Sequence, residues 1–414
     1  MEAFVSQNNS TARKSLLAGG AAITFVVLLG VVSLLADMTY EGGRSLHGQF
    51  LQILGSSATA VAVAAGAGEF LGYGIRFFSG YVADRSRRYW AITIIGYAIN
   101  MLAIPAMALA GQWQLAIALL FLERIGKGIR NPARDAMLSY ATSQMGRGFG
   151  FGLHEALDQI GAITGPLLVA GALALQIGGR VDVASYHNAY ALLLAPALLA
   201  LAVLLAARFL FPRPSELESK TPRIGTQGLS RQYGLYLVAV ACFAAGFADF
   251  ALMAYHLKAV ALVGDQWIPV CYALAMAVDA VAALVLGKLY DTLGFRVLLG
   301  VFVLAAFFAP LVFLGSLPLA LAGLALWGIG MGAQESIMRA VVSDLVPRDR
   351  RASGFGLFHT GYGIAWFLGS ALMGVLYDEA RIYLVIFSIV IQLLAIPALL
   401  AAHRAQAREA PAAE

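Results

Sequence analysis

The chain repeats part of itself. Residues 150–153 read Gly-Phe-Gly-Leu, and residues 354–357 read the same four residues 204 positions later. Gly165 and Gly369 match at the same offset. A repeat that spans half of a 414-residue chain predicts two lobes of one fold, related by an approximate symmetry axis.

The repeat is set in an unusually apolar sequence. Hydrophobic residues make up 60% of the chain and charged residues 12%, with a mean hydropathy of +0.78. A typical soluble domain has about 45–50% apolar and about 25% charged residues, and a soluble chain of this length could not bury so much apolar surface in cores of normal size. The apolar runs are long, without the short alternating strands of a β-barrel. The sequence therefore predicts an all-α membrane protein.

Twelve of these runs approach the roughly 20 apolar residues that a membrane-spanning helix needs. We expect spans at residues 16–46, 52–82, 90–110, 113–141, 148–177, 185–211, 232–260, 267–290, 296–316, 318–345, 353–378 and 382–402. The repeat divides them into two pseudo-symmetric six-helix bundles, residues 1–211 and 232–404. Residues 212–231, with several prolines and charges, form the predicted cytoplasmic linker, and residues 405–414 form a predicted disordered tail.

Lys and Arg recur in alternate connections between the runs, as at residues 85–88 and 348–351. Since cytoplasmic loops are enriched in these residues, both termini are expected in the cytoplasm, and the chain is expected to be a multi-pass protein of the inner cell membrane. The net charge of +5 is spread over these connections rather than gathered in one patch, so we expect no nucleic-acid partner.

One connection carries a family signature. Residues 80–88 read Gly-Tyr-Val-Ala-Asp-Arg-Ser-Arg-Arg, and this segment resembles the loop between the second and third helices of the major facilitator superfamily. The usual form of that loop is Gly-x-Leu-Ala-Asp-Arg-x-Gly-Arg, so Arg87 stands where the family has glycine. Residues 287–294 are a degenerate second copy. Arg124 resembles the fourth-helix arginine of the superfamily, and residues 161–166 partly resemble its antiporter motif.

The resemblance implies a secondary active transporter, in which two bundles rock around a central site and open it to each side in turn. It also implies a charged latch that closes the cytoplasmic face, for which the loop and the end of the fourth helix supply the residues. The alternative is that these residues only staple the loop. The predicted latch residues are Gly80, Asp84, Arg85, Arg88, Arg130, Arg134, Asp135 and Asp291.

Several charged residues lie within the apolar runs, where each costs about 2.5–3.5 kcal/mol on insertion scales. In the first run Asp37, Tyr40, Glu41 and Arg44 follow helical steps of three and four, which puts them on or near one face. A proton or substrate site explains this face, and a self-neutralising structural cluster is the alternative. In the second run Glu69 and Arg76 share a face two turns apart. A functional site and a structural role explain this pair equally well.

The fourth run carries a basic stripe. At 100° per residue, Lys127, Arg130 and Arg134 lie within about 60° of one another on a helix. Such a stripe cannot face lipid, although arginines near its cytoplasmic end could reach the headgroups. We assign Arg124 and Lys127 to the cavity, and the stripe favours a cargo with a negative or strongly polar group.

The remaining predicted site residues lie in four other runs. Glu155 and Asp158 are carboxylates three positions apart, which suits a proton carrier or salt bridges to the fourth run. The other members are Asp249, the repeat mate of Asp37; Glu335, four positions before Arg339; and His359 with Tyr362, on one polar-aromatic face.

Together these features predict proton-coupled export of a small organic solute; the partial antiporter motif favours export. One alternative is an uptake or exchange carrier for an organic anion or metabolite. Another is a lipid-handling or sensor protein without coupled transport. We expect no enzyme, since the sequence has neither a phosphate-binding Gly-Lys-Ser/Thr loop nor a His-Glu-x-x-His motif. The expected partners are the substrate, protons and the bilayer, around a monomer without cofactor or metal.

Overall fold

A computed structural model describes residues 2–145, 147–175, 181–214, 230–346 and 351–409, and all regular structure in these residues is helical. The first half contains α1 (Glu2–Ile53), α2 (Ala58–Ser86), α3 (Tyr89–Ala106), η1 (Met107–Leu109), α4 (Trp113–Met145), α5 (Arg147–Ala174), α6 (Val183–Leu192) and α7 (Leu194–Leu210). The second half contains α8 (Arg231–Gly246), α9 (Phe250–Ala259), η3 (Asp265–Trp267), α10 (Ile268–Leu293), α11 (Arg296–Ala306), α12 (Phe308–Leu314), α13 (Leu317–Glu335), α14 (Ile337–Leu345), α15 (Arg351–Glu379) and α16 (Arg381–Glu409).

The predicted all-helical, multi-span fold is confirmed. Within the described residues, 11 helical stretches are long and apolar enough to cross a membrane. The pairs α6–α7, α8–α9, α11–α12 and α13–α14 each make one interrupted span. The long helix α4 covers the fourth predicted run, but its charged residues keep it outside these 11 by composition. Most of the predicted linker and residues 410–414 of the predicted tail lie outside the described residues, while α16 continues to Glu409.

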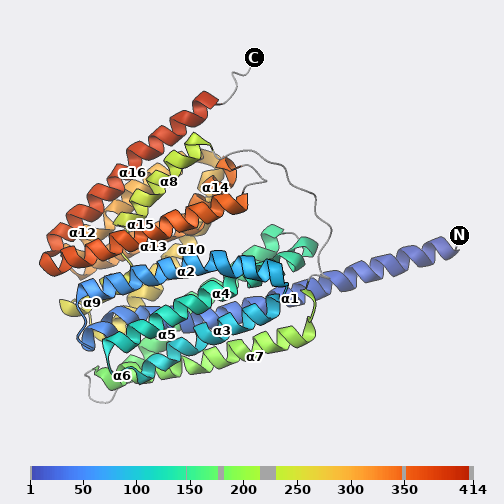
Figure 1. The fold of residues 1–414 in the computed structure, drawn as a ribbon, viewed down its shortest axis with the longest axis horizontal. Helices are drawn as coiled ribbons and strands as arrows, with labels where there is room; N and C mark the ends of the chain where they lie inside the picture. Colours follow the sequence, from blue (N-terminus) through green and yellow to red (C-terminus); the bar gives the residue numbers. More distant parts are fainter. Residues whose placement is uncertain (1, 146, 176–180, 215–229, 347–350, 410–414) are drawn as a thin grey trace.

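The helices form two bundles, α1 to α7 and α8 to α16 (Figure 1). The bundles meet where α2 packs on α15, α5 on α10 and α1 on α9. By the sequence offsets, α15 is the repeat mate of α5, and α10 is the repeat mate of α2. The contact of α2 with α15 and the contact of α10 with α5 are therefore equivalent under the repeat, as an approximate two-fold axis between the bundles requires.

Glycines at matching positions show the same symmetry at close range. A Cβ added at Gly128 would lie 2.9 Å from the carbonyl oxygen of Gly72, so α4 packs backbone to backbone on α2. A Cβ at Gly332 would lie 2.7 Å from the carbonyl oxygen of Asp279, which brings α13 equally close to α10. Small residues permit such approach between membrane helices, and the repeat thus preserves packing positions as well as sequence.

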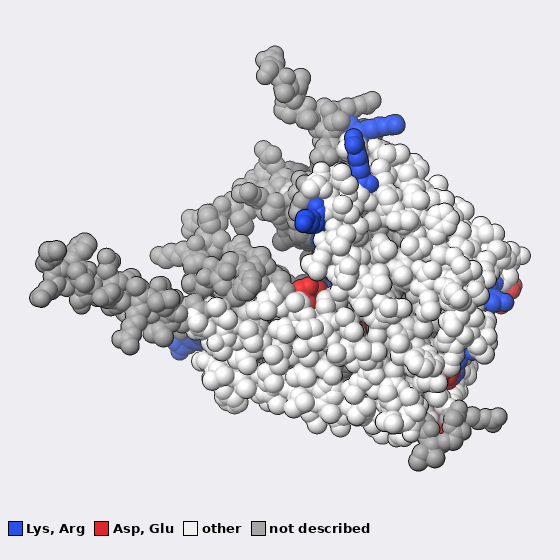
Figure 2. Space-filling model, turned by 180° about the vertical axis from the view of Figure 1, so that it is seen from behind, with Lys and Arg blue, Asp and Glu red and all other residues white. Residues whose placement is uncertain are grey.

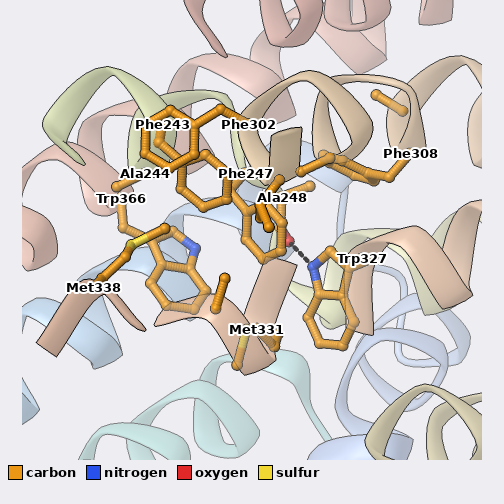
Figure 3. Close-up of a cluster of buried hydrophobic side chains, with 14 of the residues drawn as sticks. Phe243, Ala244, Phe247, Ala248, Phe302, Phe308, Trp327, Met331, Met338 and Trp366 are labelled. Carbon is orange, nitrogen blue, oxygen red and sulfur yellow. Dashed lines mark hydrogen bonds between the residues drawn. The ribbon is translucent and has the colours of Figure 1, made fainter. Parts of the chain in front are cut away.

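An aromatic core in the second bundle surrounds a break between α8 and α9 (Figure 3). The rings of Phe247 and Trp327 stack with centroids 5.7 Å apart, and Phe243 stacks on Phe247 at 5.2 Å. The Trp327 indole donates a 2.9 Å hydrogen bond to the carbonyl oxygen of Ala248. Because broken helices inside a membrane must satisfy their backbone groups internally, this bond stabilises the break and holds Asp249 in place.

The two bundles are closed at one end and separate toward the other (Figure 1). We call the end that holds the α1–α2 turn the far side, and the end toward which both termini project the terminal side. On the far side, the Thr59 hydroxyl donates a 2.5 Å hydrogen bond to Asp378, which joins α2 to α15. The Tyr186 hydroxyl donates a 3.0 Å bond to Asp265, and Lys258 pairs with Asp265, which joins α6 to the second bundle.

Candidate functional site

A buried ion-pair network crosses between the bundles at Arg44. This α1 guanidinium donates a 2.9 Å hydrogen bond from Nη2 to Asp249 Oδ2 in the other bundle. It also lies 3.6 Å from Glu69 Oε1 on α2 and 4.0 Å from Glu41 Oε2 one turn before it. Arg44 and Asp249 are only 6% and 2% exposed. Three carboxylates thus surround one cation, and one of the three belongs to the opposite half.

Asp249 is held by its backbone position as well as by its ion pair. It lies in the break between α8 and α9, and its carboxylate accepts a 2.9 Å hydrogen bond from the backbone N–H of Ala251 as the N-cap of α9. The helix dipole favours a negative charge there. Nearby, the Tyr272 hydroxyl of α10 donates a 2.5 Å bond to Glu41, which is a further polar contact between the bundles.

Glu69 extends the network to a second arginine on α4. Arg124 Nη1 lies 3.0 Å from Glu69 Oε1, and its Nε lies 3.4 Å from Glu123 Oε2. The Asn100 amide donates a 2.7 Å bond to the other oxygen of Glu123. Glu69 therefore joins two buried arginines, and neutralising its charge would loosen both at once.

Two cations of the basic stripe lie against aromatic rings rather than in open space. Lys127 Nζ lies 3.4 Å from the centroid of the Tyr40 ring, and the Arg124 guanidinium lies 5.0 Å from the same ring. Arg130 packs 4.2 Å from the ring of Tyr97 and is 1% exposed. Two of the three stripe cations therefore contact aromatic rings of the protein, while Nε and Nη1 of Arg130 have no hydrogen-bond partner within the described residues.

A cavity of about 620 Å³ opens between the bundles on the terminal side of this network. Residues of α4, α5, α10, α13 and α14 line it, and Figure 2 shows an indentation between the lobes with acidic atoms at its inner end. The charged and titratable lining residues are Arg134, Asp135, His154, Glu155, Asp158, Glu335 and Arg339. Arg134 and Asp135 pair at 2.8 Å. Among the described residues, the other carboxylates of the lining outnumber Arg339, so the lining carries a net negative formal charge.

The lining contains polar atoms without a partner. His154 is 95% buried, and its Nε2 has no hydrogen bond within the described residues. One carboxylate oxygen of Asp158 is also buried and unbonded there. Just behind the lining, Asp279 of α10 is 2% exposed, and its strongest charge interactions are with Glu335 and Glu155. Unsatisfied buried polar groups of this kind are expected where a ligand or water binds.

The other predicted site residues lie on α1, α2 and α15. His359 of α15 stacks on Tyr73 of α2 with centroids 5.6 Å apart, and Arg76 lies 4.8 Å from the same ring. The Tyr362 hydroxyl donates a 3.0 Å bond to Gln334. Asp37 is half-buried on α1, and its strongest favourable charge interaction is with Lys127.

The predicted latch residues are dispersed in this structure. Arg85 donates a 2.9 Å hydrogen bond to the hydroxyl of Tyr81 within α2, and Gly80 faces Pro132 of α4. Arg88 lines a separate pocket on the terminal side. The side chains of Asp84 and Asp291 lie outside the described residues. The latch therefore stays a prediction.

Tyr272 and Asn100 are network members that the sequence did not single out. Neither carries a charge, and each is recognised only by its contact with a carboxylate from a distant segment. The predicted pair of Glu335 and Arg339 spans a break at Ser336 between α13 and α14, so the two residues do not share one continuous helix.

Comparison with known proteins gives a consistent picture. The family model of the Major Facilitator Superfamily matches residues 15–262 and 260–414. An uncharacterized protein of Mycobacterium tuberculosis is 41% identical over 382 residues, which are 91% of this chain and 92% of that protein. An uncharacterized MFS-type transporter of Methanocaldococcus jannaschii is 28% identical over 366 residues, covering 85% of this chain and 88% of the other.

Among solved structures, a bacterial homolog of the human lysosomal transporter Spinster, in an inward-facing and unoccupied conformation, has a TM-score of 0.75 to this chain. The alignment covers 95% of this chain and 99% of that one at 15% identity. At this identity the likeness concerns the fold alone.

Proposed function

Because the chain belongs to the Major Facilitator Superfamily, we propose that it exports a small organic cation by proton-coupled alternating access. The observation that carries this proposal is the net-negative cavity between the bundles, which adjoins a buried ion-pair network that crosses from one bundle to the other. Family membership makes the chain a membrane transporter, and the charge of the cargo, the direction and the coupling are the parts proposed here.

The arrangement supports an inward-facing state. The far side is closed by contacts between the bundles, while the cavity lies toward the terminal side. We place the terminal side in the cytoplasm of the cell because Lys and Arg are concentrated in the connections at that end. The cavity would then receive its cargo from the cytoplasm.

Proton coupling would operate through the shared carboxylates. Glu69 is bonded to Arg124 and lies near Arg44, which in turn holds Asp249 of the other bundle. A proton on Glu69 would remove one negative charge from the network. Buried positive charges are costly at low dielectric unless negative charges pair with them. Arg44 and Arg124 would then rearrange, which changes the contact between the bundles. Protons entering from outside would drive this step and expel the cargo.

We expect proteoliposomes containing the full-length protein to move a lipophilic cation such as tetraphenylphosphonium against its gradient when a pH gradient is imposed. Dissipating the pH gradient with an ionophore should reduce accumulation to the level of empty liposomes. Transport that continues unchanged without the gradient contradicts proton coupling. A lipid-handling or sensor protein would give no flux with any solute under either condition.

The sign of the cargo can be tested with two matched substitutions in the cavity lining. Glu335→Gln and Arg339→Gln each remove one charge from the same cavity. A charge contact within a partly wet site is worth about 1.4 kcal/mol or more, so Glu335→Gln should weaken tetraphenylphosphonium binding about tenfold. Arg339→Gln should leave that binding unchanged or strengthen it. The reverse pattern, with an organic anion such as benzoate bound by the unmodified protein, supports the anion carrier instead.

A further inference from the structure

A second pocket lies at the terminal side of the first bundle, apart from the cavity between the lobes. Its volume is about 680 Å³, and it is formed by the end of α2, the start of α3 and the end of α7 with the residues that follow. Within the described part of the chain, its four charged lining residues are all arginines: Arg87, Arg88, Arg208 and Arg213. We call it the arginine pocket. Guanidinium groups present a planar set of donors that matches the oxygens of a phosphate.

Arg87 has a backbone conformation that glycine adopts more readily than arginine does. Arg87 has φ 54° and ψ 19°, the left-handed conformation, at the C-terminal cap of α2. Residues with a Cβ adopt this conformation at a cost, whereas glycine adopts it freely. The superfamily loop that this segment resembles has glycine at this position. The chain therefore keeps a guanidinium in the pocket where the backbone itself favours glycine.

The start of α3 adds a favourable dipole to the same pocket. The residues of its first turn, Tyr89 and Trp90, line the pocket. The helix dipole favours an anion at such a position. The Trp90 indole donates a 3.0 Å hydrogen bond to the carbonyl oxygen of Phe211, which fixes the segment after α7 against the first turn of α3.

Apolar side chains beside the pocket indicate where its ligand comes from. Ile95 of α3 is 55% exposed, and Phe209 and Leu210 at the end of α7 are 80% and 64% exposed. In a membrane span, exposed side chains of this kind face the acyl chains. The arginines thus lie next to a lipid-facing surface at the level where headgroups begin.

We propose that the arginine pocket binds the phosphate of an anionic phospholipid headgroup in the leaflet on the terminal side. The guanidinium groups of Arg87, Arg88 and Arg208 would hold the phosphate beside the first turn of α3, and the acyl chains would lie along α3 and α7. Basic pockets between membrane helices bind such headgroups by the same chemistry. A free phosphate ion shares this chemistry and is the alternative source of the ligand.

The test measures the thermal stability of the full-length protein in nanodiscs of phosphatidylcholine, with increasing phosphatidylglycerol or with added inorganic phosphate. Anionic lipid should raise the melting temperature, since a ligand that binds the native state stabilises it. Each basic residue near an anionic surface contributes roughly a fivefold factor in affinity. Arg87→Gly should therefore weaken the apparent lipid affinity about fivefold, and the double variant Arg87→Gly, Arg208→Gln about 25-fold.

Two controls separate binding from folding. Arg87→Gly should melt at the same or a higher temperature than the unmodified protein in pure phosphatidylcholine, because glycine accepts the left-handed backbone. Arg296→Gln with Arg404→Gln removes two exposed arginines on the terminal side of the other bundle and should keep the full lipid response. Equal stabilisation of all variants by phosphatidylglycerol would overturn the proposal, as would stabilisation by inorganic phosphate with no response to the lipid.

Discussion

Replacing Asp249 by asparagine should release the far side of the transporter. Asn and Asp cap helices equally well, so the bond to the backbone N–H of Ala251 is preserved while the charge that faces Arg44 is removed. A buried hydrogen bond between charged groups is worth about 1.5–3 kcal/mol. We therefore expect the ratio of far-side-closed to far-side-open molecules to fall about 10- to 100-fold, and coupled transport to fall with it.

The change can be measured with a single reporter cysteine. The described part of the chain holds two cysteines, Cys242 and Cys271, and both can be replaced by serine to give a background for labelling. Ala62 is 1% exposed on α2 and packs near Gly374 of α15 on the far side, so a cysteine there reacts with a membrane-impermeant maleimide only when the bundles part.

Asp182→Asn is the matched control for this experiment. Asp182 caps α6 on the far side through Ser185, and its bonds stay within its own bundle. The backbone and side-chain bonds of Ser185 lower the pKa of Asp182, so the control also removes a true negative charge. Equal labelling of Asp249→Asn and the control would show that the pair of Arg44 and Asp249 does not hold the far side closed.

The fold could be predicted from sequence because its signals are repeated or periodic. Twelve apolar runs and a repeat at a nearly constant offset predict two six-helix bundles. The close glycine contacts at Gly128 and Gly332 are separated by the same sequence offset. The helix breaks were not predictable in this way. The break before Phe250 depends on Trp327, almost 80 positions along the chain, whose indole satisfies the exposed carbonyl group.

The site was predictable one helix at a time. Steps of three and four placed Glu41 and Arg44 on one face, but the partner of Arg44 lies 205 positions away on the other bundle. The basic stripe of α4 predicted an anionic cargo, because sequence spacing shows which cations share a face and not which carboxylates oppose them. Arg124, one turn before the stripe, pairs with Glu69 of α2, and this tertiary contact could not be read from the spacing within α4.

The largest effect is expected from Gly48→Val on α1. A Cβ at Gly48 would overlap the carbonyl oxygen of Ala251 and lie 3.0 Å from the backbone nitrogen of Tyr255, both on α9 of the other bundle. Backbone atoms cannot turn aside as a flexible side chain can, so the two helices must separate. The far-side-closed state should therefore become inaccessible, and transport should fall below about 1% of the unmodified rate, which corresponds to roughly 2.7 kcal/mol or more.

In the Gly48→Val protein, the cysteine at position 62 should react with the maleimide from the far side at its maximal rate. It should do so even under conditions in which this cysteine is protected in the protein with Gly48. Gly171→Val is the matched control, since a Cβ at Gly171 of α5 meets no atom within 4 Å. Gly369→Val supplies a contrast, because its Cβ would overlap the Ala245 backbone inside the second bundle and should lower folding yield rather than open the far side. A Gly48→Val protein that purifies normally, stays protected from the maleimide and transports at the unmodified rate would show that alternating access does not depend on this contact. Normal folding together with an open far side and lost transport is expected only for a glycine at the contact between the two bundles. A packing defect inside one bundle would lower folding yield without separating the bundles on the far side.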